Sequence, residues 1–72
     1  MSEMTRNFVL VNFKKLKNAE NFLAAILENQ TVTEKQKLNA QNLVILQMAE
    51  LLSAMCELEY TKENIKFINE LE

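Results

Sequence analysis

Few residues in this chain could take part in chemistry. Cys56 is the one cysteine, and the chain contains no His that could act as a base toward its thiol. Its neighbours Met55 and Leu58 are apolar, which predicts a buried structural thiol rather than a nucleophile. A single cysteine rules out an internal disulfide. Without His it also leaves a structural zinc site short of ligands.

The acidic residues do not form a recognisable acid–base or metal site either. Glu57 and Glu59 are two positions apart, as are Glu70 and Glu72, and residues with that spacing point away from each other on a helix. The chain has no Asp and no Gly, both of which a calcium-binding loop normally requires. We therefore expect a protein without enzymatic activity, metal or cofactor.

A basic cluster near the N-terminus is the candidate surface for nucleic acid. It combines four cations with two aromatic residues: Arg6, Lys14, Lys15, Lys17, Phe8 and Phe13. A three-helix layout would also permit a helix-turn-helix motif. However, such a motif must present polar side chains to the bases, and the second helix is the most apolar segment of this chain. DNA binding is therefore the alternative, and the net charge of −2 disfavours it.

Length and composition predict one small domain, residues 1–72, that needs help to be stable. A chain of 72 residues buries only about 60% of its unfolded surface, so its core is marginal. With disulfide and metal excluded, association with another chain is the expected source of extra stability. No stretch of 18 apolar residues occurs, and the run Phe8–Val11 is too short for a signal peptide. Together with the lone cysteine, this predicts a cytoplasmic protein with no membrane partner.

The first predicted element is a helix from about Asn12 to Asn29. Its apolar residues recur at helical spacing on one side: Leu16, Ala19, Phe22, Leu23, Ile26 and Leu27. Upstream, the β-branched and aromatic run Phe8–Val11 would suit a short strand. No second strand exists to pair with it, so we favour a helix that continues back to about Arg6, capped by Ser2 or Thr5.

Residues 30–33 form the clear break. Thr33 and Gln36 have the spacing of a capping box, which predicts a helix start at Glu34. The pattern continues to Tyr60, and a short connection places the two helices antiparallel. Thr61 then caps a third helix, Lys62–Leu71. The expected fold is all-α: a long helical hairpin plus a short C-terminal helix, completed by oligomerisation or by a partner.

The second helix carries too wide an apolar arc for a one-sided helix. A first row has heptad-like spacing: Val44, Met48, Leu51, Met55 and Leu58. A second row runs beside it: Ile45, Ala49, Leu52 and Cys56. Because Ala49 and Cys56 are small, we expect the second row to pack on the first helix. The flexible Met residues then make the first row the predicted partner-binding surface. Gln47, Glu50, Ser53 and Glu57 are left for the solvent side.

These features predict a non-enzymatic protein-binding module that regulates or inhibits a larger protein through helix–helix contacts. The abundance of Lys, Asn, Glu and Ile, which have AT-rich codons, fits a phage or plasmid origin. In layout the hairpin is similar to the small co-chaperones of type III secretion needles and to dimeric hairpin regulators of plasmids. That likeness implies an alternative role, as a co-chaperone or assembly subunit that shields a partner's helix.

Overall fold

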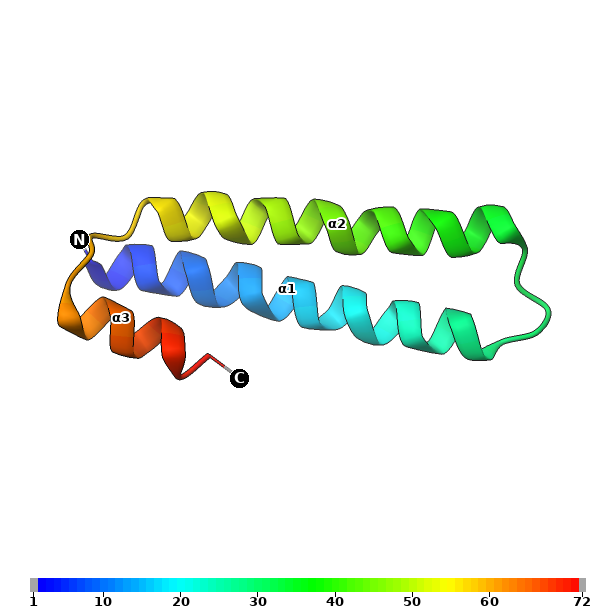
Figure 1. Cartoon of the computed structure of the whole chain (residues 1–72), viewed down its shortest axis with the longest axis horizontal. Coiled ribbons are helices and arrows are strands. Elements are labelled where there is room, and N and C mark those ends of the chain that lie inside the picture. Colours follow the sequence, from blue (N-terminus) through cyan, green and yellow to red (C-terminus); the bar gives the residue numbers. More distant parts are fainter. Residues whose placement is uncertain (1, 72) are drawn as a thin grey trace.

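The computed structural model describes the backbone of residues 2–71 and the side chains of residues 3–71. It contains three helices in the part described, α1 (Ser2–Glu28), α2 (Glu34–Cys56) and α3 (Lys62–Asn69). Figure 1 shows α1 and α2 as a long antiparallel hairpin, with α3 folded back beside the start of α1. The molecule measures 47 × 18 × 15 Å, and its radius of gyration is 14.8 Å. A compact chain of this length would have a radius of gyration of about 11 Å. The predicted fold class is confirmed, and the shape is extended.

Helix α1 is longer than the sequence pattern predicted. It runs without interruption through Phe8–Val11, so the strand alternative for that run is wrong and the helical one is confirmed. The chain has no Gly or Pro that could break a helix there. Thr5 lies inside α1, where it cannot be the N-cap. The side chain of Ser2, the other predicted cap, lies outside the described residues.

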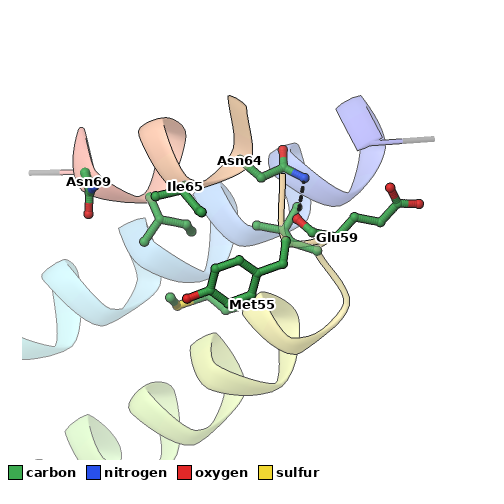
Figure 2. Close-up of a pocket in the computed structure, with 8 residues that line it drawn as sticks. Met55, Glu59, Asn64, Ile65 and Asn69 are labelled. Atoms are coloured by element: carbon green, nitrogen blue, oxygen red, sulfur yellow. Dashed lines mark hydrogen bonds between the residues drawn. The ribbon is translucent and has the colours of Figure 1, made fainter. Parts of the chain in front are cut away.

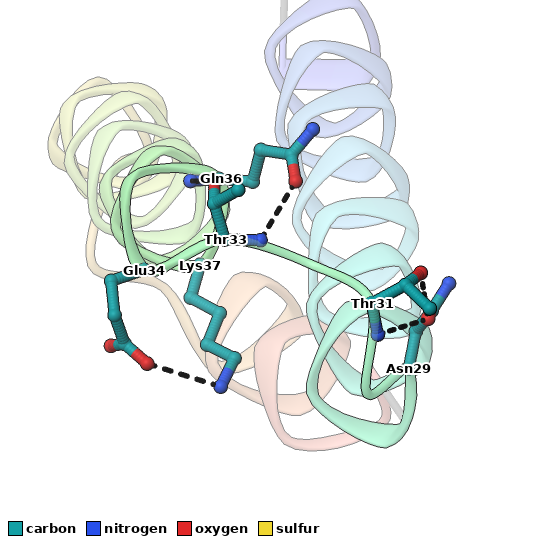
Figure 3. A network of polar contacts seen from close by, with 6 residues as sticks. All are labelled: Asn29, Thr31, Thr33, Glu34, Gln36 and Lys37. Atoms are coloured by element: carbon teal, nitrogen blue, oxygen red, sulfur yellow. Dashed lines mark hydrogen bonds and ion pairs between the residues drawn. The ribbon is translucent and has the colours of Figure 1, made fainter.

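The connection between α1 and α2 is closed by short-range polar contacts (Figure 3). The Thr33 hydroxyl accepts a hydrogen bond from the Gln36 N–H at 3.2 Å, and the Gln36 Oε1 accepts one from the Thr33 N–H at 2.9 Å. The predicted capping box is therefore present. Just before it, Asn29 Oδ1 accepts from both the N–H and the hydroxyl of Thr31. These bonds end one helix and begin the next within a few residues, which fixes the antiparallel hairpin.

The second connection begins earlier than predicted. Helix α2 ends at Cys56 rather than at Tyr60, and Glu57 is its C-cap. Helix α3 starts at Lys62 as expected, because the Thr61 hydroxyl accepts from the Asn64 N–H at 3.2 Å. It ends at Asn69, two residues before the predicted end. The chain therefore has room between Cys56 and Thr61 to turn and bring α3 against the hairpin.

The inside of the hairpin follows a heptad pattern on both helices. In α1, buried and half-buried residues recur three and four positions apart: Val9, Asn12, Leu16, Ala19, Leu23 and Ile26. In α2 they do the same and define the inner seam: Lys37, Ala40, Val44, Gln47, Leu51 and Ala54. The fully buried apolar residues in the described chain are small, namely Val9 and three alanines. Small residues let the helix backbones approach closely, but they bury little apolar surface.

The packing prediction for the second row of α2 was wrong. Ile45 is 63% exposed and Leu52 is 59% exposed, and Ala49 and Cys56 are exposed as well. The small residues that face α1 are Ala40 and Ala54 instead. The assignment relied on the small size of Ala49 and Cys56, and it left Gln47 on the solvent side. Gln47 is in fact half-buried on the inner seam, which turns α2 so that the second row points outward.

Candidate functional site

The five residues of the first row do not form one exposed surface. Val44 and Leu51 are half-buried on the inner seam, which faces α1, and Leu58 is half-buried beyond the end of α2, in the connection to α3. Met55 is also half-buried, and Met48 is about half exposed. A partner would therefore reach Val44 and Leu51 only if the hairpin opened. Partner binding by these residues remains a prediction.

A second heptad seam runs along the outside of α2. This outer seam consists of Leu38, Gln41, Ile45, Met48, Leu52 and Met55, again three and four positions apart. Leu38, Ile45 and Leu52 are each more than half exposed. Of the three helices, α2 separates its apolar and polar sides least, as a helix with two apolar seams must. The seven-residue spacing of these three residues is a signal in the sequence that indicates this seam.

Exposed apolar side chains also gather along one flank of α1. We call this set the α1 flank: Met4, Phe8, Val11 and Phe22, with Leu43 contributed by α2. Its residues line three shallow depressions along the hairpin. One holds Phe8 and Val11 beside Glu57, and the next brings Phe22 together with Leu43 and Lys15. Phe8 and Phe22 place two exposed aromatic rings on one side of α1. Aromatic side chains of this kind often anchor a protein–protein contact.

A cleft lies where α3 meets the end of α2 (Figure 2). Its volume is about 230 Å³, and its walls are mainly apolar, with Met55 and Leu58 on one side and Ile65 and Ile68 on the other. Pockets for small-molecule ligands are typically about 300–1,000 Å³. The cleft is smaller and open to solvent, so its size suits one side chain better than a cofactor.

Asn64 holds α3 in place at this end of the molecule. Its Nδ2 donates to the Glu59 carbonyl at 2.9 Å, and its Oδ1 accepts from Arg6 Nε at 2.7 Å. The first bond stabilises the turn before α3, and the second links that helix to α1. Only 3% of Asn64 is exposed, and both ends of its amide have partners. Asn64 therefore acts as a structural connection, and it offers no free polar group to a ligand.

The basic cluster near the N-terminus does not form a single patch. The Arg6 guanidinium is engaged by Asn64, and the Lys17 ammonium lies 5.4 Å from the centre of the Phe13 ring and 3.6 Å from Glu20. Lys15 lies instead in the depression beside Phe22 and Leu43, on the α1 flank. A protein that binds the phosphate backbone needs several free cations on one face, and two of these four, Arg6 and Lys17, already have partners within the chain.

The remaining chemical candidates offer no site within the part of the chain that the structure describes. Cys56 is exposed, so the prediction of a buried thiol was wrong. Cys56 belongs to the second row of α2, and the orientation of α2 places that whole row on the outside. Among residues 3–71, no three His, Cys, Asp or Glu side chains cluster as a metal site would require. None of the described helices is long and apolar enough to cross a membrane.

The fold is thus an extended helical hairpin with a short third helix and two uncovered apolar surfaces. Comparison of the chain with protein-family models, with curated proteins and with solved structures gave no match. These two surfaces are the features of the described residues that could bind another chain.

Proposed function

We propose that this chain is a non-enzymatic protein-binding module that regulates or inhibits a larger protein by helix–helix contact. The observation that carries the proposal is the α1 flank, where Phe8 and Phe22 are each about half exposed although the hairpin has its own interior. Exposed apolar surface costs free energy in water, and large apolar side chains gathered on one face are a common mark of a binding site.

The shape of the α1 flank favours a helical ligand. The flank follows α1 over about five turns, from Met4 to Phe22, and its depressions are shallow and open. An amphipathic helix that lies along the hairpin would place apolar side chains into these depressions at intervals of three to four residues. Lys15 and Glu57 border the flank and would give such a ligand a preferred direction.

A site-specific photo-crosslinker tests this proposal in the native host. The reactive group is placed at position 22, within the α1 flank, and in a matched variant at position 21, where Asn21 is exposed but lies on another side of α1. We expect a defined protein adduct from position 22 that unlabelled chain competes away, and none from position 21. Equal labelling from both positions, or no competed adduct, would contradict the proposal.

A further inference from the structure

We propose that the outer seam of α2 packs against the same seam of a second copy of this chain, with the two α2 helices antiparallel. The α1 flank is a different surface, so this inference stands apart from the proposed function. The dimer would be a bundle of four long helices, with the two α2 helices at its centre and the two α1 helices outside.

The first support is the spacing of the exposed apolar residues. Leu38, Ile45, Met48 and Leu52 are between 48% and 63% exposed, and they follow the three-and-four spacing that lets two helices pack along a common seam. Helix α3 reaches Met55 at one end of this seam through the cleft, but it does not extend along the rest of α2 (Figure 1). The seam is thus left open over about four turns.

The second support is the symmetry of the seam. Leu38 and Leu52 lie seven positions before and after Ile45. If one copy is reversed about a two-fold axis near Ile45, Leu38 of each copy meets Leu52 of the other, and the two Ile45 side chains meet at the axis. Such an interface uses the same patch on both copies and closes at two, so it leaves no free seam for further growth.

The third support is the distribution of charge along the hairpin. The half near the α1–α2 connection, residues 14–49, has five basic and three acidic side chains, a net charge of +2. The other half, residues 3–13 and 50–71, has three basic and six acidic side chains, a net charge of −3. An antiparallel pair places opposite charges side by side, whereas a parallel pair places like charges together. The dipoles of two antiparallel α2 helices also oppose each other favourably.

The fourth support is the small interior of the single chain. Val9 is the largest side chain that is fully buried among the described residues, and the other buried apolar residues are alanines. Pairing the outer seams would remove four large apolar side chains per copy from water. A partner with an unrelated sequence could cover the seam too, but it would have to match Leu38, Ile45 and Leu52 as well as the charge gradient, as a reversed copy does.

Sedimentation equilibrium of the purified chain tests the association. We expect a dimer at tens of micromolar and a monomer for Ile45→Asp, which places a charge on the two-fold axis. Leu46→Asp is the matched control, because Leu46 is adjacent and 55% exposed but lies off the seam. That variant should remain dimeric. Circular dichroism checks that all three proteins stay helical. A wild-type chain that is monomeric at about 1 mM, or a dimer that Leu46→Asp but not Ile45→Asp dissociates, would overturn the proposal.

Spin labels on Cys56 test the direction of the pair without a further mutation, since this residue is the one cysteine and is exposed. At about 1.5 Å per residue, eleven positions from the axis on each copy separate the two Cys56 backbones by about 35 Å in the antiparallel dimer. A parallel pair would bring them to about 10 Å. A short distance in the dimer would overturn the antiparallel arrangement even if the association itself were found.

Discussion

Arg6 and Asn64 are 58 positions apart in the chain, and a 2.7 Å hydrogen bond from Arg6 Nε to Asn64 Oδ1 joins them. This bond connects the first turns of α1 to the first turn of α3. Helix α3 is only eight residues long, and isolated helices of that length are unstable in water. Its position therefore depends on Asn64 and on the apolar contacts around the cleft.

We predict that Asn64→Ala releases α3 from the hairpin. The variant loses the bonds to Arg6 and to the Glu59 carbonyl, and unfolding free energy should fall by about 1–3 kcal/mol. Hydrogen exchange should then accelerate in residues 62–69 while the amides of α1 and α2 stay protected. Asn69→Ala, an exposed asparagine on the same helix, is the control. Unchanged exchange in α3 would mean that the apolar contacts alone hold it.

The neighbouring residues Leu51 and Leu52 should respond in opposite ways to the same substitution. Leu51 is half-buried on the inner seam, so Leu51→Asp should unfold the chain and abolish its helical circular dichroism. Leu52 is 59% exposed, so Leu52→Asp should keep the helices. The row assignment made from the sequence predicts unfolding for Leu52→Asp. Thermal melts of the two variants, followed at 222 nm, therefore decide directly between the two orientations of α2.

Gln47→Met should make the hairpin more stable. The Gln47 Oε1 is buried and has no hydrogen-bond partner among the described residues, and such an acceptor costs about 1–3 kcal/mol. Met has a similar length and no acceptor that needs a partner. We expect a gain of about 1 kcal/mol, or a rise of about 4–8 °C in Tm for a domain of this size. A lower Tm would show that the amide has a favourable role, such as fixing the helix register.

Enlarging the alanines of the inner seam should be harmful, and the effect should depend on position. Ala54 has no exposed surface, so Ala54→Leu forces α1 and α2 apart and should cost about 1–3 kcal/mol. Ala49→Leu is the matched change at an exposed position on the same helix, and it should leave the monomer's stability within about 0.5 kcal/mol. Urea titrations of both variants measure the difference. Equal losses would indicate that α2 is rotated from the position described.

Thr33→Ala removes the hydroxyl that accepts from the Gln36 N–H and should cost about 0.5–2 kcal/mol. Thr33→Ser keeps that hydroxyl and should recover most of the loss. Thermal melts of the two variants measure the difference in stability. Nearly equal Tm values would mean that α2 can begin one turn later without a loss of stability.

Local signals predicted the helices well. The Thr33–Gln36 box and the Thr61 cap are contacts between residues three positions apart, so their spacing in the sequence specifies them directly. The orientation of α2 was harder to predict, because apolar residues cover much of its circumference. Burial of Gln47 and exposure of Leu38 and Leu52 result from the pairing with α1, in which Ala40 and Ala54 are the buried apolar residues of α2. The Arg6–Asn64 bond connects distant segments and has no local signature.

The length of the hairpin also governs how the molecule rotates in solution. A body of 47 × 18 × 15 Å turns more readily about its long axis than end over end, and the N–H bonds of α1 and α2 point nearly along that axis. Their ¹⁵N relaxation should therefore report slow end-over-end rotation, while amides of the connection at 29–33 sample faster components. Two hairpins that associate side by side would keep their length and gain width, so this anisotropy should decrease with concentration. Association end to end would increase it. Rotational diffusion therefore distinguishes association through the long sides of the hairpin from association through its ends.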